Sequence, residues 1–196
     1  MGPRAAAVLG AAALALAAGC GDVYVGPDED PTVGRLRCEQ PSDRPSGMHV
    51  LLAQAVPTGF AVPCLRRDVG DWMVTAFDVR DGSARIEFTY MYGPEDTATV
   101  EVAARCDVRG AGEVSTQLEG VNRYRRPATR AGRHADEVFY VYAGACTTLR
   151  FSLSGRSPFL RGSDILDAIG FVPRDRLDEQ IQRASDGNLH LDPDEQ

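Results

Sequence analysis

The sequence contains no lysine, because all 21 of its basic residues are arginine. This absence excludes a lysine Schiff base, a lysine general base and a P-loop lysine. Histidine is scarce, with three residues, and no H-E-x-x-H, G-x-S-x-G or phosphate-cradling glycine motif is present. These absences argue against the common hydrolase families.

Acidic residues outnumber basic ones by 28 to 21, which gives a formal net charge of −7. This balance argues against a nucleic-acid partner, and no motif indicates a cofactor. A length of 196 residues with 43% hydrophobic content suits one domain that builds its own core.

A short apolar run near the start of the chain ends in a cysteine. Arg4 supplies a positive charge, residues 5–18 are apolar, and Gly19 places a small side chain before Cys20. The run is shorter and richer in alanine than the roughly 18 strongly apolar residues of a membrane-spanning helix. It is typical of a cleaved signal peptide.

These residues resemble the lipobox of bacterial lipoproteins. One position departs from it, since Leu16 lies four residues before Cys20 and Ala17 takes the usual leucine place. The resemblance implies a signal peptide over residues 1–19, a diacylglycerol on Cys20, and a lipid anchor on the extracytoplasmic side of the cell membrane. The alternative is ordinary secretion with Cys20 as a free thiol.

The cysteine count favours lipidation. The chain has five cysteines, an odd number for an exported protein. If Cys20 carries lipid, the other four can pair in three ways. We favour Cys38 with Cys64 and Cys106 with Cys146, because each bridge then stays within one local unit. Cysteine spacing and histidine placement argue against a zinc site, and we expect no bound metal.

The remaining chain divides into a tether and a domain. Residues 20–47 are polar, with prolines and an acidic run at 28–30, and predict a flexible tether behind the lipidated end. Residues 48–196 predict a single α+β extracytoplasmic domain. Its strands precede its helices, which favours an antiparallel β-meander sheet packed against C-terminal helices and braced by two disulfides.

Alternation and turn residues predict the individual elements. A hairpin is expected from strands 72–79 and 84–91 around the turn 80–83. Further strands are expected at 98–104, 137–142 and 147–153, whereas 107–120 has the composition of a loop. We expect a short helix at 48–56, a helix from Ser163 as N-cap to Gly170, and another that starts at Pro173.

A dense group of arginines is the first candidate site. Guanidinium groups bind phosphate and carboxylate in a bidentate manner, so the group would suit an anionic envelope polymer or lipid headgroups. The alternative is a solvated loop whose arginines pair with nearby acids. The candidate anion-binding residues are Arg123, Arg125, Arg126, Arg130 and Arg133.

A C-terminal group is the candidate catalytic site. Asp186, His190 and Asp192 would provide an acid and base set, since a histidine beside carboxylates is a proton carrier. The calcium-loop pattern is not met there. The alternative is an Asp-Gly turn followed by a tail that covers the domain.

The domain also resembles a group of uncharacterised exported proteins of high-GC Gram-positive bacteria. The resemblance rests on the short motifs Cys106-Asp107, Tyr124-Arg125-Arg126, Gly144-Ala145-Cys146 and residues 186–192. It implies a shared fold and a Cys106 to Cys146 bridge, and no activity. We therefore expect a non-catalytic binding or interaction module, with an envelope hydrolase or accessory enzyme that uses His190 as the alternative. A membrane-protein partner is a third hypothesis.

Overall fold

The computed structural model describes residues 36–39, 44–130, 133–155 and 158–191. Within them, antiparallel strands form a seven-stranded sheet in the order β2-β3-β4-β8-β7-β6-β5. The strands are β2 (Trp72–Arg80), β3 (Ser83–Tyr90), β4 (Gly93–Ala103), β5 (Gly112–Val114), β6 (Asn122–Arg130), β7 (Arg133–Tyr142) and β8 (Ala145–Ser152). The α+β prediction is confirmed: a mainly antiparallel sheet is combined with helices that are mostly C-terminal.

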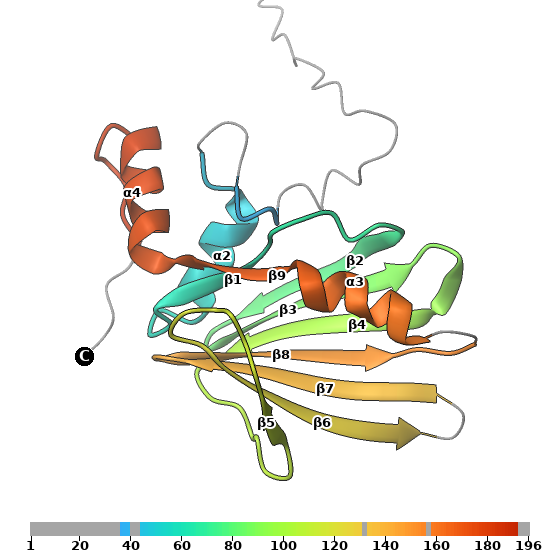
Figure 1. Cartoon of the computed structure of the whole chain (residues 1–196). Helices are drawn as coiled ribbons and strands as arrows, with labels where there is room; N and C mark the ends of the chain where they lie inside the picture. The colour runs from blue at the N-terminus through green and yellow to red at the C-terminus, as the bar shows by residue number, and fades with distance from the viewer. Residues whose placement is uncertain (1–35, 40–43, 131–132, 156–157, 192–196) are drawn as a thin grey trace, which may run out of the picture.

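A second layer lies over one face of this sheet (Figure 1). It consists of α2 (Gly47–Ala55), β1 (Ala61–Leu65), α3 (Pro158–Ala168) and β9 (Ile169–Pro173). β1 and β9 form their own antiparallel pair, with Cys64 opposite Gly170, although they are far apart in sequence. We call the sheet face beneath this layer the covered face and the opposite one the open face.

Residue alternation explains which side chains enter the core. Along β3, Ala84, Ile86 and Phe88 are buried towards the covered face, while Arg85 and Glu87 alternate with them on the open face. The hairpin between β2 and β3 turns at Gly82, whose φ of 78° favours glycine. The predicted hairpin is therefore confirmed.

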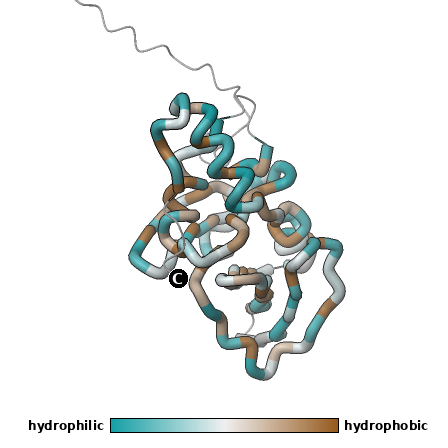
Figure 2. The backbone as a smooth tube through the Cα atoms, turned by 90° about the vertical axis from the view of Figure 1, so that its left-hand side faces the viewer, coloured by the Kyte–Doolittle hydropathy of each residue, from teal (hydrophilic) through white to brown (hydrophobic). Residues whose placement is uncertain are grey.

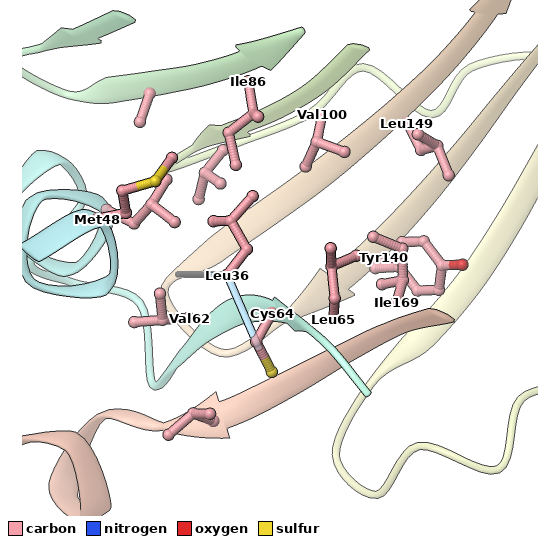
Figure 3. Packing of buried hydrophobic residues seen from close by; sticks show 14 of the residues in the cluster. Leu36, Met48, Val62, Cys64, Leu65, Ile86, Val100, Tyr140, Leu149 and Ile169 are labelled. Carbon is pink, nitrogen blue, oxygen red and sulfur yellow. The ribbon is translucent and has the colours of Figure 1, made fainter. Parts of the chain in front are cut away.

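Leu36 sits at the centre of the core, between β1 and the sheet (Figure 3). Only 1% of its surface is exposed. Both predicted disulfides are present, with Cα–Cα distances of 4.9 Å for Cys38–Cys64 and 5.7 Å for Cys106–Cys146. Residues 36–39, which the sequence assigned to the tether, thus contribute to the packed domain.

All three predicted helices are present, and two of them begin within one residue of the predicted start. Helix α2 begins after Ser46, whose hydroxyl accepts a 3.2 Å hydrogen bond from the amide of His49. Helix α4 (Arg174–Ala184) begins directly after Pro173. It buries Leu177 and Ile181, and its tube is mainly hydrophilic where it extends at the top of the molecule (Figure 2).

The predicted bounds of the helix from Ser163 to Gly170 are wrong, because the helix found there, α3, spans Pro158–Ala168. Ser163 lies inside α3, and its hydroxyl donates to the carbonyl of Leu160 at 2.7 Å. The helix ends at Ala168, because Ile169 and Gly170 pair with β1 instead. The long-range strand pairing decides this boundary.

The interpretation of the arginine-dense stretch as a loop is also wrong, because it forms strand β6. Pro127 is accommodated in β6 because β5 pairs with Arg123–Arg125, so that Pro127 lies beyond the part of this edge that β5 covers. Part of the predicted loop 107–120 forms β5. Among the described residues, no helix combines the length and apolar character needed to cross a bilayer.

Candidate functional site

A pocket of about 390 Å³ lies where the second layer meets the β6 side of the sheet. The chain between β5 and β6, olive in Figure 1, forms one wall with residues 115–118. The last turn of α3 and the start of β9 form another. Most of the lining is polar, and Leu118, Leu166 and Ile169 supply a smaller apolar surface. The polar residues are Arg66, Ser115, Thr116, Gln117, Arg123, Tyr140 and Asp167.

Arg66 follows β1 directly and is held by the backbone at the end of α3. Its amide donates to the carbonyl of Ala168 at 2.7 Å, its Nε to that of Ile169 at 3.1 Å, and its Nη2 to that of Asp167 at 3.1 Å. Its Nη1 makes no hydrogen bond within the described residues. The arginine is therefore fixed in place with donors left for another partner.

Gly170 makes room for this arginine. A Cβ at Gly170 would overlap the Cγ of Arg66, approach its Cδ to 2.9 Å, and lie 3.0 Å from the Sγ of Cys38. The side chain of Arg66 thus passes over β9 beside the Cys38–Cys64 disulfide. Glycine at this position is a steric requirement of the Arg66 conformation.

Arg123 enters the pocket from β6, where it lies opposite Tyr140 of β7. Burial raises the pKa of the Tyr140 phenol, and Arg123, which hydrogen-bonds to it, partly offsets this rise. The Nε of Arg123 is buried without a hydrogen-bond partner among the described residues. Such a donor is costly to leave unpaired.

Asp167 is the acidic residue that lines the pocket, and it has its own partner. Its carboxylate is 68% exposed and lies 3.4 Å from the Nη2 of Arg67. The Arg66 and Arg123 guanidinium groups are therefore not neutralised by it. In a chain of net negative charge, this pocket is locally cationic and suited to an anion.

The other predicted anion-binding arginines do not share this surface. Arg125 donates from Nε to the carboxylate of Asp136 at 3.0 Å, and that carboxylate is only 3% exposed. His134 also contacts it, with its Nε2 3.2 Å from Oδ2. Arg125 is thus occupied by a buried acid.

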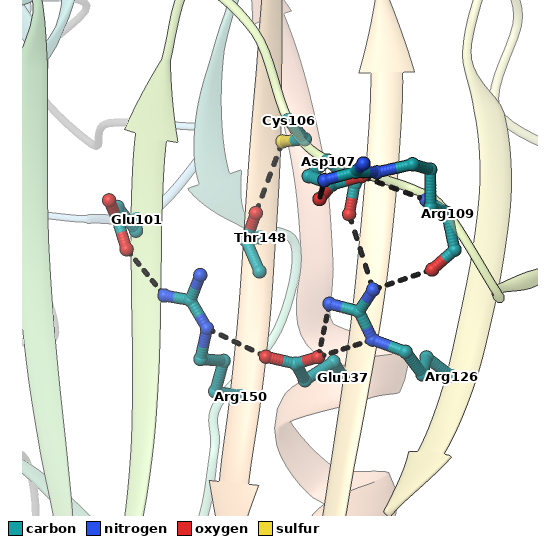
Figure 4. A network of polar contacts seen from close by, with 8 residues as sticks. All are labelled: Glu101, Cys106, Asp107, Arg109, Arg126, Glu137, Thr148 and Arg150. Atoms are coloured by element: carbon teal, nitrogen blue, oxygen red, sulfur yellow. Dashed lines mark hydrogen bonds and ion pairs between the residues drawn. The ribbon is translucent and has the colours of Figure 1, made fainter.

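Arg126 points to the open face, where it belongs to a row of ion pairs (Figure 4). Its Nε donates to Glu137 at 2.7 Å and its Nη1 to the carbonyl of Arg109 at 2.7 Å. Arg150 donates to the same Glu137 at 3.0 Å and also pairs with Glu101. Burial raises the pKa of Glu137, but these arginine hydrogen bonds outweigh it and hold the pKa below its ordinary value.

The three candidate arginines whose side chains the structure describes, Arg123, Arg125 and Arg126, therefore do not form one face. Alternate residues of a strand point to opposite sides of a sheet, which separates Arg123 and Arg125 from Arg126. The backbones of Arg130 and Arg133 are paired as strand partners at the far end of the β6–β7 hairpin. Of these three, Arg123 lines the pocket, and Arg66, which lines it too, was not found from the sequence.

Asp186 and His190, the candidate catalytic residues that the structure describes, do not line the pocket. Asp186 occupies an exposed turn with a φ of 52°. His190 is 59% exposed, and its Nδ1 lies 3.7 Å from Asp178, a residue that sequence reasoning missed. Asp178 also accepts a 2.7 Å hydrogen bond from the amide of Leu191, which fixes the chain after α4. Asp192 and Cys20 lie outside the described residues.

The described part of the chain contains no group of three histidine, cysteine, aspartate or glutamate residues arranged to hold a metal ion. No family model matches the chain, and no curated protein matches it. A crystal structure of a protein from Bacteroides thetaiotaomicron VPI-5482 is similar over 60% of this chain and 50% of that chain, with a TM-score of 0.36 and 8% sequence identity. This chain thus spans half the length of that protein. A similarity of this degree assigns no function.

Proposed function

We propose that this protein is a lipoprotein anchored on the extracytoplasmic side of the cell membrane, where it acts as a non-catalytic binding module of the envelope. Its ligand site is the pocket lined by Arg66 and Arg123. The observation that carries the proposal is the convergence of these two arginines, from separate parts of the chain, on one cavity. Pockets of a few hundred Å³ with a few fixed polar groups are typical ligand sites.

The chemistry of the lining supports binding. Guanidinium and phenol groups provide hydrogen-bond donors, while the carboxylate of Asp167 pairs with Arg67. Such a set holds an anion. We infer that the natural ligand is an anionic component of the envelope.

The proposed location rests on two features. The lipobox-like residues before Cys20 supply an acylation signal, and the two disulfides suit a compartment outside the reducing cytosol. The lipid would hold the domain at the membrane, with the chain between Cys20 and the folded body as the tether. A membrane-protein partner would fit this arrangement.

The test compares the wild-type protein with Cys20→Ser and Arg123→Gln, each expressed in its host. We expect the wild type in the membrane fraction, with a diacylglycerol mass on Cys20 and, in native mass spectrometry, a retained anionic ligand. Cys20→Ser should leave the membrane but keep the ligand, whereas Arg123→Gln should stay in the membrane and lose the ligand. A wild-type protein without a diacylglycerol on Cys20 would contradict the proposed lipid anchor. A ligand that Arg123→Gln retains as well as the wild type does would contradict the proposed site.

A further inference from the structure

The pocket combines a cationic end with a mainly polar lining that also holds a smaller apolar patch. Arg123 and Arg66 supply the charge, while Leu118 and Leu166 are partly buried hydrophobic residues that pack against the core. Ile169, also in the lining, is 3% exposed. A ligand that fills this cavity therefore meets charge and apolar surface within the same small volume.

The cationic end is suited to an oxyanion. An arginine fork matches the paired oxygens of a carboxylate or a phosphate ester. The backbone carbonyls of Ile169 and Asp167 hold the Arg66 guanidinium, so a ligand would not have to order it. The Tyr140 hydroxyl, which accepts from Arg123, keeps its own proton to donate to a second ligand oxygen.

The apolar patch argues against a bare inorganic ion. An inorganic phosphate would satisfy the arginines but would leave the surface of Leu118 and Leu166 in contact with water. A cavity of about 390 Å³ lies near the lower end of the range for small-molecule sites. The fitting occupant is a small molecule with an acidic head and a short apolar body.

Building on the proposed function, we infer that the Arg66–Arg123 pocket binds small amphipathic oxyanions. The acidic head, a carboxylate or a phosphate monoester, lies between Arg66 and Arg123 beside the Tyr140 hydroxyl. The apolar body lies against Leu118 and Leu166. Ligands of this class therefore have an acid group joined to a hydrocarbon portion.

Isothermal titration calorimetry of the Cys20→Ser chain, which avoids detergent, tests the inference. The probes are hexanoate, hexyl phosphate, the neutral hexanamide and inorganic phosphate. We expect one or both of the hexyl acids to bind at least about tenfold more tightly than hexanamide and inorganic phosphate. Comparison of the two acids shows which head group the site prefers.

Variants locate the binding site. Arg66→Gln and Arg123→Gln should each weaken hexyl-acid binding at least about tenfold, since each removes a charged hydrogen-bond donor. Leu166→Ser should reduce the advantage of the hexyl acids over inorganic phosphate. Arg85→Gln is the matched control, because Arg85 lies on the open face and pairs with Glu87 at 2.8 Å. Thermal melting of each variant verifies that the fold is retained.

The outcomes separate the inference from the proposed function. Equal binding of hexanoate and hexanamide, or unchanged binding in both arginine variants, would overturn the inferred ligand class. If no hexyl acid binds but a ligand retained from the host depends on Arg123, the binding function stands and this ligand class is wrong. If no hexyl acid binds and no ligand is retained from the host, both proposals fail.

Discussion

The two faces of the seven-stranded sheet both carry arginine, but they use it differently. On the open face, Arg126 and Arg150 share Glu137, and Arg150 also pairs with Glu101. On the covered face, Arg125 also has an acidic partner, Asp136, but Arg123 lines a pocket together with Arg66 and keeps a buried donor unpaired. Arginine density in the sequence therefore does not mark a binding surface. The informative property is which guanidinium groups still have donors without acceptors.

The largest expected effect on stability comes from replacing Arg125, whose neighbour in β6, Arg126, provides the comparison. Arg125→Gln should destabilise the fold by about 3 kcal/mol, because it leaves the carboxylate of Asp136 buried without its guanidinium partner. Arg126→Gln should cost about 1 kcal/mol or less, because Glu137 keeps Arg150 and is partly solvated. Urea unfolding of the two variants measures both values.

A double variant shows whether burial of the charge is the cause. Arg125→Gln combined with Asp136→Asn should recover part of the loss, since the buried group is then neutral. A double variant as unstable as the sum of the single ones would show that the two residues act independently. The contrast between Arg125 and Arg126 would then need another explanation.

Glu137 joins two arginines of the open face, and its loss gives the next largest effect. Glu137→Gln should lower the free energy of unfolding at pH 7 by about 1–3 kcal/mol, because it removes charged hydrogen bonds from Arg126 and Arg150. The matched control is Glu87→Gln, which removes one exposed partner of Arg85 and should cost under about 1 kcal/mol.

The contribution of Glu137 also depends on pH. Its pKa is lower in the folded state than in the unfolded chain, so the unfolded chain takes up the proton first. Its stabilisation is complete above the ordinary carboxyl pKa of about 4.3 and is lost as the pH falls through the folded value. The stability difference between wild type and Glu137→Gln should therefore narrow from pH 6 to pH 3. A difference that stays constant would rule out this linkage.

The sequence predicted those parts of the fold that local patterns specify. Ala84, Ile86 and Phe88 alternate with polar residues and follow an Asp-Gly turn, so the β2–β3 hairpin was evident. β6 was missed because its covered-face positions include Arg123 and Arg125, which break the apolar alternation. β1 and β9 stabilise each other across more than half of the chain, a pairing that no local pattern contains.

The candidate site was only partly predictable for the same reason. Arg123 was identified because it lies in a conspicuous cluster, but the cluster does not show that Arg125 and Arg126 have acidic partners. Arg66 carried no signal, since its position over the pocket depends on the pairing of β1 with β9 and on the space at Gly170. Both disulfides were predicted, yet the sequence did not show that Cys38 packs beside this arginine.

Gly170 allows a test of the pocket that leaves both guanidinium groups in place. Gly170→Ala should displace the side chain of Arg66 and weaken hexyl-acid binding about tenfold, with a smaller effect on stability because Arg66 is exposed. The control is Gly112→Ala in β5, where an added Cβ meets no atom within 4 Å. Equal affinities in the two variants would show that the Arg66 position does not matter for binding.

Replacing His190 should have the smallest effect on stability. The pair that His190 forms with Asp178 extends the comparison to a third group of charged residues. His190 is largely exposed and lies 3.7 Å from Asp178, which already accepts hydrogen bonds from the Leu191 amide and from Gln182. His190→Gln should therefore change stability by less than about 0.5 kcal/mol and leave hexyl-acid binding unchanged. Asp178→Asn should lower stability more, because it weakens the hydrogen bond from the Leu191 amide that fixes the chain after α4. If His190→Gln alone abolished a hydrolytic activity of the purified protein, the C-terminal residues would be catalytic and the binding-module proposal would be wrong.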